Sequence, residues 1–244
     1  MRIISRFQLK IPELPKDYRP IFVSFFKNVL MNYNEVLAKQ YYNDQDPIMK
    51  SFTFSILLEK PDFLAETIVL NSNTITLLVS TPDPKDGMIL YSAIANSKKK
   101  TFPLPNNNEM KITKILLPKL PEIKTNEIFI KMLSPLILRH HNKETNKDTY
   151  LDYTSENFIE KAEEIIKWQI SNYKPITNPD ILFNDFSIAP IKPQKTVITA
   201  FGQSLNASLG IYKLTGHPVL LNFLYLSGIG SRRNQGFGAF EILA

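Results

Sequence analysis

The chain has 244 residues, of which 43% are hydrophobic and 21% charged, and its formal net charge is +6. It contains no cysteine, which excludes disulfides and cysteine-ligated metal sites, and no apolar run approaches the ~18 residues of a membrane-spanning helix. The length suits one large domain or two of roughly 100–120 residues, and the positive charge favours an anionic partner such as nucleic acid.

The first half of the chain predicts the order strand–helix–strand–strand–helix–strand. Alternating apolar residues indicate a strand at Arg2–Leu9, and apolar residues at helical spacing indicate one helix from about Pro20 to Tyr42. Three β-rich segments follow at 51–58, 66–70 and 74–80. A helix is then expected at 86–95, with Asp86 as its cap, and a strand at 109–117. This is the ferredoxin-like βαββαβ order.

The second half approximates the same order after a proline-containing linker at residues 118–126. We expect a strand at Ile128–Arg139, then a helix capped by Thr154 or Ser155. Two or three strands are expected within 181–209, another at 210–214, a short helix at 218–226 and a last strand at 239–243. The predicted fold is α+β, with two tandem ferredoxin-like domains at residues 1–120 and 127–244 and a central cleft.

The most informative segment is residues 228–240, GIGSRRNQGFGAF, which holds four of the eight glycines of the chain. Glycine backbone N–H groups can cradle an anion, and an arginine adds a planar fork that matches phosphate oxygens. The segment fits neither a dinucleotide fingerprint nor a P-loop. It predicts a C-terminal glycine-rich, phosphate-binding loop made by Gly230, Ser231, Arg232, Arg233 and Gly236. The alternative is a glycine-rich turn before the last strand.

Three motifs carry a resemblance to a known family. The tail spaces its residues as G-x-G-x-x-R-x-x-G-F-G, Lys50 precedes the strand SFTFS, and Ser134–Pro135 lie at the first strand of the second half. Together with the two ferredoxin-like halves, these motifs resemble the CRISPR repeat-RNA endoribonucleases of the repeat-associated (RAMP) superfamily. The resemblance spans nearly the whole chain.

This resemblance implies an endoribonuclease that needs no metal and no cofactor and cuts within the repeats of a long CRISPR transcript. The 2′-hydroxyl would attack the adjacent phosphate and leave 2′,3′-cyclic phosphate and 5′-hydroxyl ends. Many relatives place a histidine near the end of the first helix, where this chain has Tyr42. The resemblance therefore makes Tyr42, Lys50 and Lys27 the candidate catalytic residues, with Lys50 at the basic position of the family.

Further basic residues are candidates for RNA contact. Lys192 and Lys195 lie in a predicted hairpin of the second half and suit phosphate oxygens. Arg139–His140–His141 end a predicted strand. The interpretations that stay open are a polar strand end, or histidines that contact RNA or reach the active cleft from across the molecule. A metal site is not indicated, because no carboxylate at ligand spacing accompanies the two histidines.

The function also has alternatives. Without the usual histidine, the protein could hold repeat RNA and cut it slowly or not at all, or it could be a structural RAMP subunit of a CRISPR effector complex. CRISPR repeat RNA is the expected partner, and a homodimer and other effector subunits stay open. No membrane is expected as a partner. Since no apolar signal core follows Met1, we expect a cytoplasmic protein.

Overall fold

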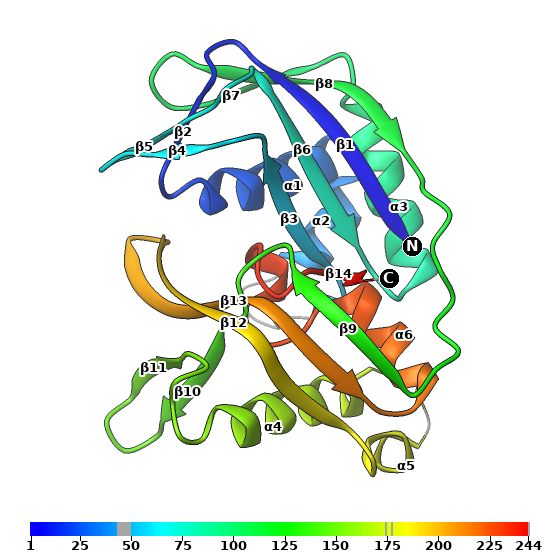
Figure 1. The fold of residues 1–244 in the computed structure, drawn as a ribbon. Helices are drawn as coiled ribbons and strands as arrows, with labels where there is room; N and C mark the ends of the chain where they lie inside the picture. Colours follow the sequence, from blue (N-terminus) through cyan, green and yellow to red (C-terminus); the bar gives the residue numbers. More distant parts are fainter. Residues whose placement is uncertain (43–49, 174, 177, 244) are drawn as a thin grey trace. The chain divides into compact units, whose positions relative to one another are not determined.

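The computed structural model describes residues 1–42, 50–173, 175–176 and 178–243 (Figure 1). The chain divides into two compact units, Met1–Leu120 with Thr199–Gly202 and Pro121–Ile198 with Gln203–Ala244. Each unit combines an antiparallel sheet with helices, so the predicted α+β class is confirmed.

The main sheet of the first unit has the strand order β3-β6-β1-β8-β7. Its strands are β1 Arg2–Leu9, β3 Thr53–Leu58, β6 Thr74–Ser80, β7 Thr101–Pro103 and β8 Glu109–Leu116. The central strand β1 pairs antiparallel with β6 and β8. The order β3-β6-β1-β8 places the first strand of the βαββαβ unit between the third and the fourth, which confirms the ferredoxin-like prediction for this half.

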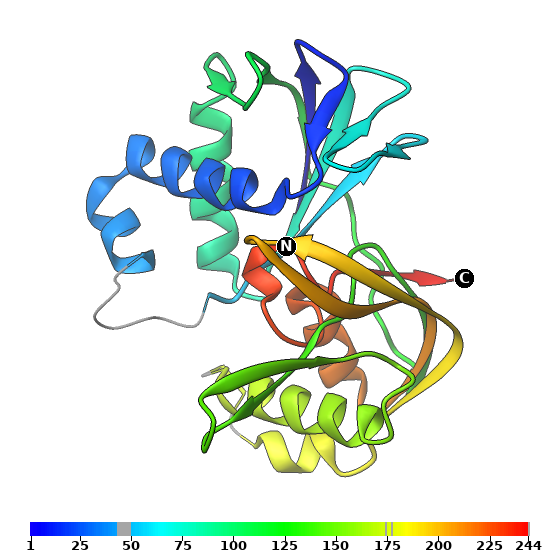
Figure 2. The same cartoon turned by 90° about the vertical axis from the view of Figure 1, so that its left-hand side faces the viewer.

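Helices cover one face of this sheet, as Figure 2 shows for α1 and α3. The helices of the unit are α1 Arg19–Tyr33, α2 Glu35–Tyr41 and α3 Pro84–Asn96. The inner face of α1 is buried at the spacing that the sequence predicts: Phe22, Phe25, Phe26, Val29 and Leu30. Each such side chain contributes about 1.5–3 kcal/mol by leaving water, so this face fixes α1 on the sheet.

The single helix expected from Pro20 to Tyr42 is wrong, because Asn34 interrupts it. Asn34 has extended backbone, with φ −159° and ψ 108°, and its side chain accepts a hydrogen bond from Leu37 N at 3.1 Å. An asparagine is a favourable first residue for a new helix, so α2 starts after it in its own direction. The cap of α3 is also not Asp86: Asp83 accepts from Lys85 N and Asp86 N, and Pro84 opens the helix.

Three short strands form a separate sheet in the first unit, in the order β2-β5-β4. They are β2 Glu13–Pro15, β4 Asp62–Phe63 and β5 Thr67–Val69. The strand predicted at 66–70 is therefore real but belongs to this small sheet. The sequence did not predict the strands β2, β4 and β7, because strands of two or three residues leave no alternating pattern long enough to detect.

The main sheet of the second unit repeats the order of the first, β12-β13-β9-β14. Its strands are β9 Glu127–Met132, β12 Ser187–Ala200, β13 Gln203–Thr215 and β14 Phe240–Leu243. Its helices are α4 Phe158–Ser171, α5 Pro179–Phe183 and α6 Pro218–Ser227, with a short 3-10 helix at Arg233–Gln235. Strand β9 pairs antiparallel with β13 and β14, so this half is ferredoxin-like as predicted.

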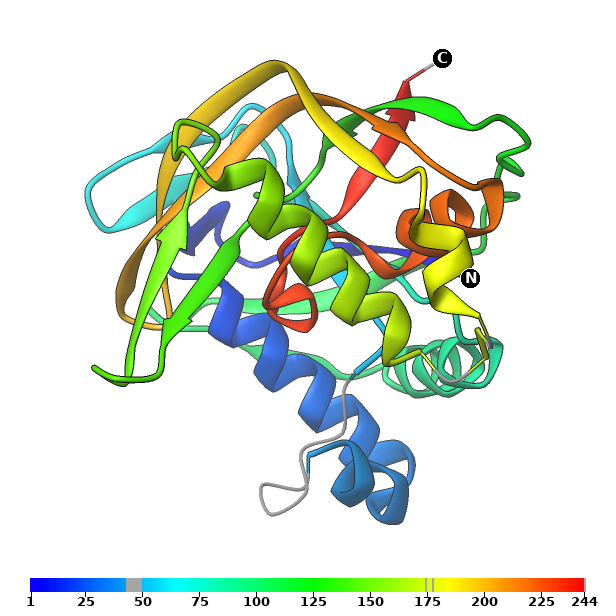
Figure 3. The same ribbon diagram turned by 90° about the horizontal axis from the view of Figure 1, so that it is seen from below.

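The strand predicted at Ile128–Arg139 is two strands in the structure. Strand β9 ends at Met132, and β10 Leu138–Asn142 pairs with β11 Lys147–Leu151 in a hairpin that lies beside α4 (Figure 3). Pro135 has no N–H to offer a neighbouring strand, so the sheet cannot continue through it. The chain leaves the sheet there, held by a hydrogen bond from Gly238 N to Pro135 O at 2.9 Å.

Three further details of the second unit differ from expectation. Asn157 precedes α4, so neither Thr154 nor Ser155 is its cap, and the region 181–209 begins with α5 rather than with a strand. The strand predicted at 210–214 is the second half of β13.

Within the described part of the chain, no helix combines the length and the apolar character that crossing a bilayer requires.

Candidate active site and glycine-rich loop

The three residues predicted as catalytic meet in the first unit. Lys50 Nζ lies 4.3 Å from the centre of the Tyr42 ring, and Lys27 Nζ lies 6.0 Å from it. Lys27 comes from α1, Tyr42 from the end of α2 and Lys50 from the approach to β3. We call these three residues the Lys–Tyr cluster. It presents two ammonium groups against the face of one aromatic ring, an arrangement that the ring quadrupole favours.

The neighbours of the cluster are fixed by one carboxylate. Asp86, in the first turn of α3, accepts a hydrogen bond from the Tyr41 hydroxyl and another from Ser51 Oγ at 2.5 Å. Ser51 Oγ also lies 2.8 Å from Thr81 Oγ1 at the end of β6. Tyr41 precedes Tyr42 and Ser51 follows Lys50, so Asp86 holds the chain on both sides of the cluster. The N-terminal end of α3 favours a negative charge at this position.

Burial determines what Tyr42 can do chemically. Burial raises the pKa of the Tyr42 phenol well above its ordinary value. The side chain therefore stays protonated at neutral pH, and the lysines nearby do not turn it into a base. A protonated phenol can donate a hydrogen bond, while the two ammonium groups supply positive charge. The cluster is suited to orienting a hydroxyl and stabilising an oxyanion.

The glycine-rich loop lies in the second unit and is bonded to the start of the β10–β11 hairpin. Ser231 N donates to Ile137 O at 2.8 Å, and Ser231 Oγ accepts from Arg139 N at 3.1 Å. Gly230 has φ +87°, and a Cβ built there would lie 2.7 Å from Ile137 O. Only glycine can therefore bring the loop backbone this close to the strand.

The two adjacent arginines of the loop have opposite environments. Arg232 is partly exposed, adopts left-handed backbone with φ +54°, and places its guanidinium 5.0 Å from the centre of the Tyr150 ring. It also donates a hydrogen bond to the Tyr150 hydroxyl. Arg233 is only 8% exposed and donates to Ser227 O at 2.9 Å. Burial lowers its pKa to about 10. Arg232 lies partly exposed against Tyr150, whereas Arg233 supports the loop from within.

Gly236 closes the 3-10 helix that Arg233 begins. It is buried, has φ +89°, and donates its N–H to Arg233 O at 3.1 Å. Its place makes it part of the loop framework, and the partly exposed residues of the loop are Ser231, Arg232, Asn234 and Gln235.

The two lysines predicted to contact phosphate lie on β12 and differ in their partners. Lys192 is exposed. Lys195 Nζ forms an ion pair with Asp152 Oδ2 at 3.0 Å. Burial pushes the pKa of the Asp152 carboxyl up, but hydrogen bonds from Thr154 and Lys195 outweigh this and hold it below its usual value. The Asp152 carboxylate therefore stays charged and competes with any other anion for Lys195.

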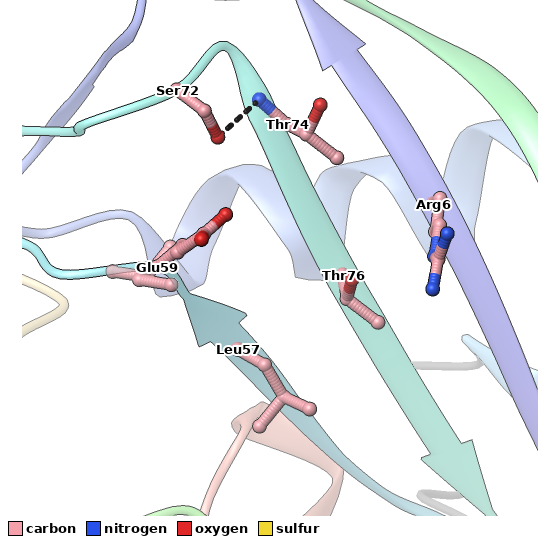
Figure 4. A pocket seen from close by; sticks show the side chains of 7 residues that line it. Arg6, Leu57, Glu59, Ser72, Thr74 and Thr76 are labelled. Carbon is pink, nitrogen blue, oxygen red and sulfur yellow. Dashed lines mark hydrogen bonds between the residues drawn. The ribbon is translucent and has the colours of Figure 1, made fainter.

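A cavity lies on the strands of the first unit, on the side away from its helices. Figure 4 shows this cavity of about 470 Å³, which is lined by Arg6, Leu57, Leu58, Glu59, Ser72, Thr74 and Thr76. Ser72 Oγ accepts from Thr74 N at 3.3 Å at its edge. None of its lining residues belongs to the predicted site, and it holds one positive and one negative side chain.

Sequence reasoning missed the partners that hold these groups in place. Asp86 appeared only as a helix cap, and Tyr150 did not appear at all. The one available signal was the short alternation around Tyr150 in KDTYL, which is too short to separate a strand from a loop. Both residues act through contacts with segments at least 35 positions away.

Comparison with known proteins gives a family match and a set of related folds. The family model described as "CRISPR associated protein Cas6, C-terminal" matches residues 118–242. The search of the curated proteins finds no match.

Several solved structures share the fold over the whole chain. One described as an RAMP protein binding different RNA substrates has a TM-score of 0.84 and 22% identity, covering 100% of both chains. A Cas6-related protein from Pyrococcus furiosus has a TM-score of 0.85 and 22% identity, covering 100% of this chain and 98% of that one. A structure described as CRISPR associated protein Cas6 has a TM-score of 0.79 and 20% identity, covering 100% of this chain and 99% of that one. At 20–22% sequence identity, these similarities show a shared fold only.

Proposed function

The chain belongs to the Cas6 family of CRISPR-associated proteins, and on this premise we propose that it binds CRISPR repeat RNA and cleaves it without a metal ion. The family acts in the processing of repeat transcripts. One structural neighbour of this chain is described as binding different RNA substrates, and another, a Cas6 protein, is described as a product complex. The observation that carries the proposal is the Lys–Tyr cluster, which gathers Lys27, Tyr42 and Lys50 at one place.

In the proposed reaction the RNA supplies its own nucleophile. The 2′-oxygen forms a bond to the adjacent phosphorus, and the bond from phosphorus to the 5′-oxygen breaks. The proton of the 2′-hydroxyl passes to solvent, and the leaving 5′-oxygen takes a proton from the Lys50 ammonium group. Lys27 and Lys50 offset the charge of the phosphorane, and the Tyr42 phenol orients the 2′-hydroxyl. Stabilisation of this kind contributes about 10²–10³-fold in rate for each well-placed donor.

A denaturing gel tests the proposal directly. Purified protein is mixed with end-labelled RNA of one repeat in excess EDTA. The products are then treated with phosphatase with and without prior acid, because a 2′,3′-cyclic phosphate resists phosphatase until acid opens the ring. We expect one defined cut with a cyclic-phosphate end. No cut, or a cut that EDTA abolishes, would contradict metal-independent cleavage.

A second function is favoured by the residue at position 42, a tyrosine where many relatives place a histidine, because burial raises the pKa of its phenol. A phenol that stays protonated cannot serve as a general base, and such catalysis is ordinarily worth about 10²–10⁴-fold. The protein would then hold repeat RNA while cutting it slowly or not at all, alone or as a subunit of a CRISPR effector complex. The same gel separates the two functions, because a binding protein shifts the RNA in a native gel and yields no product.

The two loop arginines are expected to respond differently to substitution. Arg232→Ala should weaken RNA binding and lower the slope of log Kd against log salt by about 0.7, the value for one lost phosphate contact on a single strand. Arg233→Ala should weaken binding with the salt slope unchanged, because Arg233 is 8% exposed and supports the loop through Ser227 O. Fluorescence anisotropy over a salt series measures both quantities.

Circular dichroism provides the control for this pair of variants. Arg233→Ala should lower the melting temperature, since it leaves the Ser227 carbonyl without its donor, and Arg232→Ala should leave it near that of the unmodified protein. A reduced salt slope for Arg233→Ala would assign it a direct phosphate contact and contradict its framework role.

A further inference from the structure

We propose that a cavity on the β10–β11 hairpin is a second binding site for the RNA backbone, where the strand continues from the glycine-rich loop. This inference rests on the proposed function and extends it to residues that the family motifs do not include. The cavity, which we call the hairpin cavity, has a volume of about 630 Å³. The residues of its lining that carry the argument are Arg139, His141, Lys147, Tyr150, Gln203 and Ser204.

The charges in the hairpin cavity favour an anion. Arg139 and Lys147 are positive, and Asp148 is the one acidic side chain of the lining. Asp148 shares its carboxylate between Arg139 Nε at 2.7 Å and His141 Nδ1 at 2.8 Å. Hydrogen bonds from His141 and then Arg139 hold the pKa of Asp148 below its usual value. The carboxylate orients both basic side chains, and a positive charge remains in surplus.

The hairpin cavity and the glycine-rich loop are joined by two contacts within the second unit. Arg139 N donates to Ser231 Oγ at 3.1 Å, so β10 begins where the loop passes. On β11, Tyr150 lines the cavity and also stacks with the Arg232 guanidinium at 5.0 Å. An RNA strand held at Arg232 can therefore continue along hairpin residues that already touch the loop.

The chemistry of the lining fits a single RNA strand better than an acidic peptide. Lys147 suits phosphate oxygens, and Arg139 adds positive charge beside it that Asp148 shares. The stacked Arg232–Tyr150 pair offers planar groups on which a base can stack. Gln203 and Ser204 add an amide and a hydroxyl, which can bond the 2′-hydroxyl or a base edge. An acidic peptide would use the cations but would leave the stacking pair and the amide without a role.

The test compares two lysines of the same hairpin. Lys147 lines the cavity, while Lys143 is exposed in the turn and does not line it. Binding of a fluorescently labelled single-stranded repeat RNA is measured by anisotropy from low to high salt. We expect Lys147→Ala to raise Kd about three- to tenfold and to lower the salt slope by about 0.7. Arg139→Ala should act in the same direction, and Lys143→Ala should match the unmodified protein.

The outcomes separate this inference from the function on which it rests. If the unmodified protein neither binds nor cuts repeat RNA, the proposed function fails and the hairpin cavity loses its ligand with it. If the unmodified protein binds and cuts, but Lys147→Ala keeps both the affinity and the salt slope of Lys143→Ala, the hairpin cavity alone is refuted. Because Lys147 is an exposed residue, its variant stays informative even if Arg139→Ala loosens the hairpin.

Discussion

Lys50→Ala is expected to slow single-turnover cleavage of repeat RNA by about 10²–10³-fold, while the affinity for the RNA changes by less than about threefold. The ammonium group lies 4.3 Å from the Tyr42 ring and is the proposed proton donor and charge partner of the phosphorane. Its positive charge matters most where charge develops during the reaction, so its loss should appear in the rate constant rather than in binding.

Lys39→Ala is the matched control for Lys50→Ala. Lys39 lies on α2, is exposed, and pairs with Glu35 at 2.6 Å in a surface contact worth little to stability. Both variants remove one positive charge from the same unit, so a general field effect would slow both. Quenched-flow or manual single-turnover assays with protein in excess give the rates. Equal rates for Lys50→Ala and the unmodified protein would remove Lys50 from the active site.

Gly238→Ala should destabilise the protein by about 3 kcal/mol or more, a drop of roughly 6–12 °C in melting temperature for a chain of this size. Gly238 has φ +72°, and a Cβ built there would lie 1.9 Å from Ile229 O. That backbone contact cannot relax by a side-chain rotation, and Ile229 N itself donates to Gly238 O at 2.9 Å. The substitution therefore forces the two ends of the glycine-rich loop apart.

Gly202→Ala separates backbone strain from this clash. Gly202 has nearly the same φ, +71°, but a Cβ built there meets nothing within 4 Å. The cost should be that of the left-handed conformation alone, about 1–2 kcal/mol. Thermal unfolding followed by circular dichroism measures both variants. If the two lower the melting temperature equally, the close approach of Gly238 to Ile229 does not hold the loop together.

The order of both ferredoxin-like halves could be predicted because its signals are local. The alternation in Arg2–Leu9 and the spacing of phenylalanines along α1 each encode a buried face within a single element. The break at Asn34 was missed because the apolar spacing continues across it. The β10–β11 hairpin was missed because most of its residues are exposed, so no apolar face marks its strands.

The site shows a similar division. The proximity of Lys27, Tyr42 and Lys50 was expected from the family resemblance, since residues on three different elements leave no common pattern in the sequence. The environments of Arg232 and Arg233 could not be told apart, because two identical neighbours carry no sign of which one is buried. The left-handed backbone at Arg232 and the Ser227 carbonyl decide this, and both are tertiary features.

Because Arg232 and Arg233 have opposite orientations, the loop surface can be changed separately from the loop framework. One guanidinium braces the turn from inside and its neighbour projects outward onto Tyr150, so the scaffold and the outward-facing surface are carried by separate side chains. Libraries that vary positions 232 and 150 while keeping 233 and the glycines are therefore expected to change how tightly the loop holds RNA without rebuilding its framework.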